Sequence, residues 1–298
     1  MPGIFFEPQD RRKFLTTVSL GATALAVAGC RTPTRRVEAS RSLHMALLSD
    51  THLPGDRKNG SRGFNPWENL RAIVPEVVAL RPQAVLLNGD AARLEGLPAD
   101  YNELRASLQP IAALAPIFIG MGNHDDRTNF AKTFTAPASL KANLANKHVL
   151  VIDEDFMRIV LLDSLLYTNK TAGHLGKTQR AWLSEYLATN SEKPIVIFVH
   201  HTLGDGDGEL LDAAQLFELL EPHPQVKAIF YGHSHVWEIK ERGRLKLVNL
   251  PAVGYNFKDG DPVGWVDAKF DSGGVDLTLR ALAGNRKDGR KIHRLDWV

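Results

Sequence analysis

The sequence has almost no cysteine. Cys30 is the only one among 298 residues, so no disulfide can form within the chain and no metal site can be built from thiolates. A strong charge of one sign is also missing, because 36 Lys and Arg residues are balanced by 34 Asp and Glu residues, for a net charge of +2. Proteins that bind nucleic acids usually present a strongly basic face. We therefore expect no nucleic-acid partner.

The N-terminal apolar stretch is too short to span a membrane, which takes about 20 residues. It follows Arg11-Arg12-Lys13 and ends in small residues before Cys30, a pattern typical of a bacterial export signal. Twin arginines followed by Phe-Leu resemble the twin-arginine export signal. Val27-Ala28-Gly29-Cys30 resembles a lipobox, in which Cys30 becomes the lipidated first residue of the mature protein.

These features predict three parts of the chain: an export signal peptide at 1–29, a tether at 30–42 and one folded domain at 43–298. We expect an exported protein in the periplasm or cell envelope, anchored to the membrane through a lipid on Cys30. Two alternatives stay open. The ordinary signal peptidase could cleave after Ala28, or the protein could be cytoplasmic with a misread start.

The rest of the chain alternates between two hydrophobic periodicities. Short apolar runs predict strands at 43–50, 84–90, 116–119, 194–201 and 226–235. Helical spacing predicts helices at 67–82, 101–114, 175–190 and 212–223. A hairpin is expected at 148–166, and antiparallel strands after 236. This alternation predicts an α/β protein whose central strands are largely parallel.

Five of these expected strands run into side chains that can bind metal ions. In open α/β sheets ligands gather outside the carboxyl ends of the strands, so we expect the five segments to meet. Residues two apart on an extended segment point to the same side, which suits Asp50 with His52 and His233 with His235. Carboxylate, imidazole and amide groups without thiolate suit Mn, Fe, Zn or Co. The candidates are Asp50, His52, Asp90, Asn123, His124, His200, His201, His233 and His235.

In this order, the segments resemble the five signature blocks of the calcineurin-like metallophosphoesterase superfamily, in its cyclic-nucleotide phosphodiesterase-like branch. The resemblance implies a four-layer αββα sandwich that holds two divalent metal ions. It implies one ion on Asp50, His52 and His235, and a second on Asn123, His200 and His233. Asp90 would bridge both ions, and His124 would face the substrate.

Two ions about 3.5–4 Å apart can clamp a phosphate and lower the pKa of a bridging water, whose hydroxide then attacks phosphorus. His124 is our candidate for the general acid that protonates the leaving oxygen. Asp125 or Asp126 could orient its ring, or either could cap a turn. His200 is the preferred ligand of the adjacent pair, with His201 as the alternative.

Three further positions have a functional and a structural interpretation. Arg93 could pair with a phosphate or a ligand carboxylate, or face solvent. The loop at 53–67 could roof the cleft with Phe64 and Trp67, or Trp67 could belong to a helix that packs on the core. His174 could lie near the cleft or be a structural histidine.

The leading hypothesis is an exported phosphoesterase that hydrolyses a small phosphodiester or phosphomonoester. The alternative is a non-catalytic lipoprotein that binds metal or a phosphorylated ligand on the same scaffold. Metal identity, the choice between diester and monoester, and the oligomeric state are left open by the sequence.

Overall fold

The computed structural model describes residues 41–298 and contains two six-stranded sheets. The strands of the first sheet are β1 (Ser42–Leu48), β2 (Ala84–Leu87), β3 (Ile117–Ile119), β10 (Pro262–Asp271), β11 (Gly274–Gly284) and β12 (Ile292–Asp296). Those of the second are β4 (Leu150–Asp153), β5 (Arg158–Leu161), β6 (Ile195–Phe198), β7 (Val226–Tyr231), β8 (Glu238–Arg242) and β9 (Leu245–Asn249). Their orders are β12-β11-β10-β1-β2-β3 and β4-β5-β6-β7-β9-β8.

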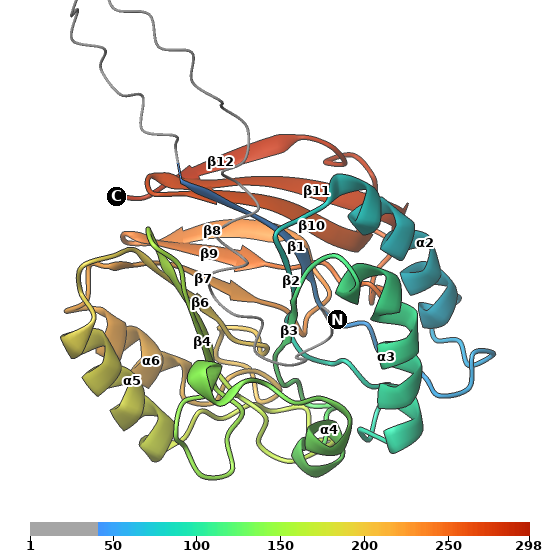
Figure 1. Cartoon of the computed structure of the whole chain (residues 1–298), viewed down its shortest axis with the longest axis horizontal. Coiled ribbons are helices and arrows are strands. Elements are labelled where there is room, and N and C mark those ends of the chain that lie inside the picture. The colour runs from blue at the N-terminus through green and yellow to red at the C-terminus, as the bar shows by residue number, and fades with distance from the viewer. Residues whose placement is uncertain (1–40) are drawn as a thin grey trace, which may run out of the picture.

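Helices cover the outer faces of both sheets (Figure 1). On the side of the first sheet lie α2 (Pro66–Leu80) and α3 (Pro98–Ala112), and on the side of the second lie α5 (Lys177–Thr189) and α6 (Ala213–Leu220). The predicted four-layer αββα sandwich is therefore confirmed. The sequence did not predict the short helix α4 (Arg127–Thr133) or the 3-10 turn at Ala138–Leu140.

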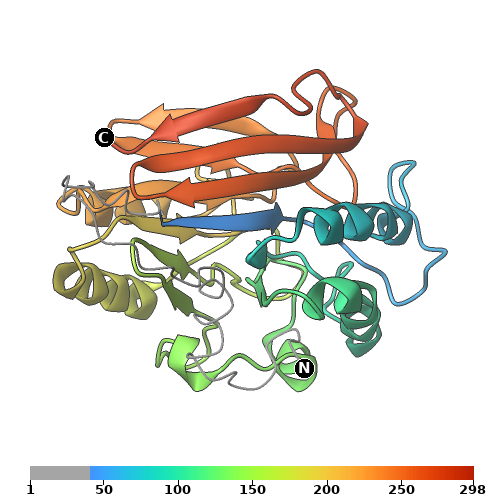
Figure 2. The same ribbon diagram turned by 45° about the horizontal axis from the view of Figure 1, so that its top comes forward.

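The central strands are parallel and buried. β1, β2 and β3 pair in parallel, as do β5, β6, β7 and β9. All residues of β2 and of β6 are buried, which explains their unbroken apolar sequences. Antiparallel strands extend both sheets: β1 pairs with β10 on its other side, next to β11 (Figure 2). The parallel centre brings the carboxyl ends of five strands together.

The predicted boundaries needed small corrections. Asn65 caps α2 and Pro66 opens it, while Arg81 ends it in a left-handed conformation one residue before Pro82. Pro110 lies inside α3, which continues to Ala112. β1 begins at Ser42, a residue we assigned to the tether. The predicted signal peptide and Cys30 lie outside the described residues.

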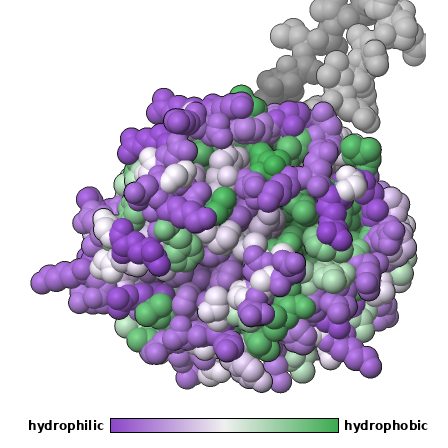
Figure 3. Space-filling model, turned by 180° about the vertical axis from the view of Figure 1, so that it is seen from behind, coloured by the Kyte–Doolittle hydropathy of each residue, from purple (hydrophilic) through white to green (hydrophobic). Residues whose placement is uncertain are grey.

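The surface of the described part carries no extended apolar face on the side seen in Figure 3, where hydrophilic residues surround small hydrophobic groups. Within residues 41–298, none of the helices combines the length and apolar character that a membrane span requires.

Phe230 of β7 joins the two sheets. It stacks on Phe198 of β6 with centroids 4.7 Å apart and meets Phe270 of β10 edge-on at 6.0 Å. All three rings are fully buried. We expect Phe230→Ala to lower the free energy of unfolding by about 3–5 kcal/mol, since it removes a ring and leaves a cavity. Urea unfolding measures this change, with the half-buried Phe217→Ala as control. A loss similar to that of the control would contradict this role.

Candidate metal centre

The five strand-end segments meet where the two sheets face each other. Asp50 and His52 follow β1, Asp90 follows β2, and Asn123 and His124 follow β3. The second sheet contributes the segments after β6 and β7, which carry His200, His233 and His235. The distant segments that we expected to meet therefore lie together, and the site depends on both sheets.

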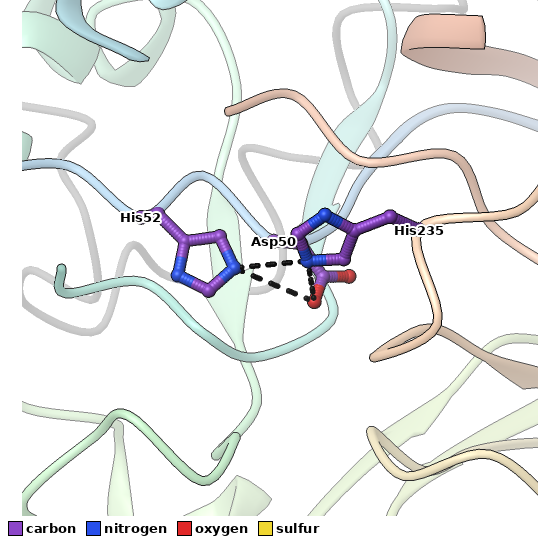
Figure 4. Close-up of side chains that lie close together, drawn as sticks. All are labelled: Asp50, His52 and His235. Carbon is purple, nitrogen blue, oxygen red and sulfur yellow. Dashed lines mark hydrogen bonds and ion pairs between the residues drawn. The ribbon is translucent and has the colours of Figure 1, made fainter. Parts of the chain in front are cut away.

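The first group of side chains is Asp50, His52 and His235 (Figure 4). His235 Nε2 lies 3.3 Å from Asp50 Oδ1, and His52 Nε2 lies 3.9 Å from the same oxygen. The two Nε2 atoms are 3.0 Å apart. Three donor atoms of carboxylate and imidazole thus point at one small volume, as the ligands of a single ion would.

Backbone carbonyls fix the tautomers of these two rings. His52 Nδ1 lies 3.2 Å from the carbonyl oxygen of Arg93, and His235 Nδ1 lies 2.5 Å from that of Tyr255. A carbonyl can only accept, so each Nδ1 is the donor and each Nε2 carries a lone pair. Two lone pairs that face each other at 3.0 Å repel. A cation between them turns this repulsion into attraction.

The second group is Asp90, His200 and His233. His200 Nδ1 donates to the Asn88 carbonyl at 2.8 Å, and His233 Nε2 donates to the Gly208 carbonyl at 3.0 Å. The remaining ring nitrogens, Nε2 of His200 and Nδ1 of His233, are therefore free to bind an ion. His200 Nε2 is buried without a hydrogen-bond partner, and so is Asn123 Oδ1. Buried polar atoms are rarely left unpaired, and metal ligation accounts for both.

Asp90 lies between the two groups. Its Oδ2 is 3.7 Å from His52 Nε2 and 3.4 Å from His200 Nε2. Burial opposes ionisation of Asp50 and Asp90, but His200 and the other nearby imidazoles together outweigh it and hold the pKa of both carboxyls below the usual range. Burial also opposes a charge on His200, yet the two carboxylates raise its pKa to about 10. A site that keeps two carboxylates ionised and draws a proton onto a buried imidazole favours cations.

The backbone of the centre is strained. Five of the candidate ligands have a positive φ, which L-residues other than Asn and Asp rarely adopt. Such conformations concentrate at functional sites, where the surrounding structure holds them in place. The five are Asp50 (52°), His52 (44°), Asp90 (48°), His233 (68°) and His235 (57°).

Gly122 allows Asp90 to approach the neighbouring strand end. A Cβ at this position would lie 2.1 Å from Asp90 Oδ1, so any side chain would displace the carboxylate. That oxygen accepts a hydrogen bond from the backbone N–H of His124 at 2.8 Å. The Gly-Asn-His sequence after β3 is therefore required for backbone geometry as well as for side-chain chemistry.

The predicted role of Asp125 needs correction. Its carboxylate is buried and accepts hydrogen bonds from the N–H groups of Ala91, Ala92 and Gly122 and from the Tyr101 hydroxyl. It forms no hydrogen bond with the ring of His124, so it holds the loops together and does not orient the imidazole.

The ring of His124 is held by a carbonyl, because its Nδ1 lies 2.9 Å from Leu94 O. Asp126 accepts from the N–H of Asn129 and caps α4, one of the alternatives that the sequence left open. The ligand atoms of His52, Asp90 and His124 also lie within 4.8 Å of one another. His124 is therefore adjacent to the candidate metal positions.

The other residues that the sequence left open make contacts within the protein, and the role of the Arg93 side chain stays a prediction. His201 is buried behind the centre, where its Nδ1 lies 2.7 Å from Ser164 Oγ. Trp67 is in the first turn of α2 and donates to Glu103. His174 lies 3.5 Å from Asp212, and Arg93 contributes its carbonyl to His52.

A cleft of about 400 Å³ opens over the centre. Its lining includes residues that the sequence did not point to: Thr171, Thr202, Gly208, Glu209, Ser234, Tyr255 and Phe257. Apart from Ser234, which stands between His233 and His235, no motif marks them. The only available signal was that Tyr255 and Phe257 follow the apolar run of β9, as the ligands follow other strands.

The sequence model of the calcineurin-like phosphoesterase family matches residues 43–237, a range that contains every strand-end segment described above. The chain belongs to this family. It is a metal-dependent phosphoester hydrolase, and its His and Asp groups fit two divalent ions.

Relatives of this phosphoesterase include a cAMP/cGMP dual specificity phosphodiesterase of Mycobacterium tuberculosis, 32% identical over 67% of this chain and 64% of the relative. A 3′,5′-cyclic adenosine monophosphate phosphodiesterase of Pseudomonas aeruginosa is 27% identical over 74% of this chain and 79% of the relative. A dimetal phosphatase of Danio rerio has the same fold, with a TM-score of 0.68 at 13% identity, over 86% of this chain and 99% of that one.

The position of Asp90 predicts that its removal affects both ion positions. We expect Asp90→Ala to lose most of its bound metal, because the variant lacks a carboxylate that lies close to ring nitrogens of both groups. Metal per chain, measured after reconstitution with Mn, Fe, Zn or Co, tests this. Glu209→Gln, a change in the same cleft outside both groups, should keep two ions. An Asp90→Ala protein that retains two ions and full turnover would contradict the bridging role.

Proposed function

We propose that this protein hydrolyses small phosphodiesters outside the cytoplasm. The first ion would be held by Asp50, His52 and His235, the second by Asn123, His200 and His233, with Asp90 shared. The observation that carries the proposal is the pair of opposed Nε2 lone pairs, 3.0 Å apart, together with the buried His200 Nε2 that has no hydrogen-bond partner. When bound, two ions supply the Lewis acidity that activates water and neutralises phosphate charge.

His124 is the proposed general acid. Its ring lines the cleft, is only partly buried and lies 5.2 Å from the ring of His52. With Nδ1 donating to Leu94 O, Nε2 is the atom that can carry a proton to the leaving oxygen. The carbonyl of Leu94 thereby takes the orienting role that we had considered for a carboxylate.

Diester substrates are favoured by the relatives, which are named as cyclic-nucleotide phosphodiesterases. The test is a panel of diesters and monoesters, at full metal loading, with Mn, Fe, Zn and Co compared. Hydrolysis of bis(4-nitrophenyl) phosphate but not of the monoester supports the proposal. The reverse preference would make the protein a monoesterase, and no hydrolysis of any ester would leave the metal- or ligand-binding role.

We expect His124→Ala to retain its ions and lose rate. General acid catalysis contributes roughly 10²–10⁴-fold, and a poor leaving group needs it most. The loss in kcat should therefore be large for an alkyl diester and small for a nitrophenyl diester, whose leaving group needs little protonation. Metal content is measured in parallel. Equal losses on both substrates would rule out the acid role of His124.

We also propose that the protein is exported and held at the membrane by a lipid on Cys30. The support is the twin-arginine pattern and the lipobox-like sequence in residues 11–30. We expect Cys30→Ala to move the protein from the membrane fraction to the soluble fraction, with loss of the lipid mass. An unchanged distribution and mass would contradict the anchor.

A further inference from the structure

An aromatic wall lies beside the metal centre and takes no part in ligation. It consists of Tyr255 and Phe257, which both line the cleft. Phe257 stacks on the ring of His235, with centroids 4.2 Å apart and 21° between the planes. Tyr255 lies 4.8 Å from the rings of both His52 and His235. The wall is therefore in contact with the first group of candidate ligands.

Phe257 is exposed although it is large and apolar. Its relative exposure is 43%, whereas Tyr255 is at 9%. One face of Phe257 is covered by His235, and the guanidinium of Arg62 lies 4.9 Å from the ring centroid. The part of the ring that stays exposed provides an apolar contact surface in the cleft.

A tight turn presents Arg62 to this ring. Ser61 and Phe64 exchange backbone hydrogen bonds of 2.8 Å, and the two residues between them, Arg62 and Gly63, have φ values of 51° and 82°. Positive φ at both central positions belongs to type I′ turns, where Asn, Asp and Gly are the favoured residues. Arginine is disfavoured in that conformation, so its presence needs another reason.

Arg62 has no acidic partner. Among residues 41–298, no carboxylate lies within ion-pair distance of its guanidinium, and its one aromatic contact is Phe257. A planar cation and a planar ring, close to a centre that acts on phosphate esters, suit a ligand that is anionic and carries a ring.

The wall also begins close to the proposed acid. His124 contacts His52, His52 contacts Tyr255, and the rings of Tyr255 and Phe257 are 5.8 Å apart. Contacts between neighbouring rings thus lead along the cleft lining from His124 to Phe257. Thr171, Thr202 and Glu209 also line the cleft.

We propose that Phe257 and Arg62 form the specificity subsite for the leaving alcohol, which carries a planar ring such as a nucleobase or an aryl group. This rests on the proposed phosphodiesterase function. The ring lies against the exposed part of Phe257, and the guanidinium of Arg62, which already lies over Phe257, contacts it as well. The subsite selects ring-bearing diesters over alkyl diesters and takes no part in bond cleavage.

The test compares two diesters of different leaving groups, adenosine 3′,5′-cyclic phosphate and glycerophosphoethanolamine, on the metal-loaded protein. We expect Phe257→Ala to lower kcat/KM for the cyclic nucleotide about tenfold, through KM, as expected for loss of one stacked base. Activity on the alkyl diester should stay within about twofold. Arg62→Ala should act in the same direction.

Phe217→Ala is the matched control, because Arg242 lies 4.1 Å from the centroid of that ring on α6 in the same kind of contact. It should change neither diester. Metal content of each variant is measured, because Phe257 supports His235. Equal losses on both diesters, or no loss on either, would overturn the subsite.

A binding experiment tests this inference separately from the proposed function. Adenosine 5′-monophosphate and glycerol 3-phosphate carry the same phosphate, and only the first carries a ring. We expect Phe257→Ala to weaken binding of the first about tenfold and to leave the second unchanged, by calorimetry. If the wild type hydrolyses no diester, the proposed function fails, while this result still supports a binding site for a ring at Phe257. Equal weakening of both ligands would overturn it.

Discussion

The carboxylate of Asp90 is the contact on which the site depends. Its Oδ1 accepts a hydrogen bond from the backbone N–H of His124, which follows β3. Its Oδ2 faces His52, which follows β1, and His200, which follows β6. One side chain therefore joins strand ends of both sheets. The two sheets can place it there only because their central strands are parallel, which brings all carboxyl ends to one side. The position of Asp90, and with it the candidate metal site, therefore depends on the arrangement of the two sheets.

Much of the fold and of the centre could be predicted from the sequence. The unbroken apolar runs of the parallel strands, each followed by a polar cluster, are strong local signals that predicted the strands, while helical spacing predicted the main helices; the four-layer arrangement was implied by the resemblance to the family. Asp50, His52, Asp90 and His235 were predicted to meet, and their donor atoms do. Their roles as ligands of particular ions stay predictions. The tautomers fixed by Arg93, Tyr255 and Asn88 could not be predicted, because they depend on carbonyls that any residue can supply.

The failures have a common physical cause. Asp125 stands next to His124 in sequence, but its side chain points into loops formed by residues 91, 92 and 122, where N–H groups need an acceptor. Arg62 and Phe257 are almost two hundred residues apart and come together only through a turn tip and the segment after β9. The spacing of residues within a motif indicates which side chains of one segment can point to the same side. It says nothing about which distant segment lies opposite.

The same distinction separates the parts of the site that perform the common chemistry from those that select a substrate. Every candidate ligand ring has its second nitrogen committed to a backbone carbonyl, and five ligands are held at positive φ, so the centre is rigid before any ion or ester arrives. Such preorganisation fixes a reaction and leaves little freedom to choose among esters. Selectivity among ester substrates must then come from groups that contact the substrate away from phosphorus. In the described residues, the ring of Phe257 and the guanidinium of Arg62 meet that requirement, because both are exposed, neither forms an ion pair and neither supplies a candidate ligand atom.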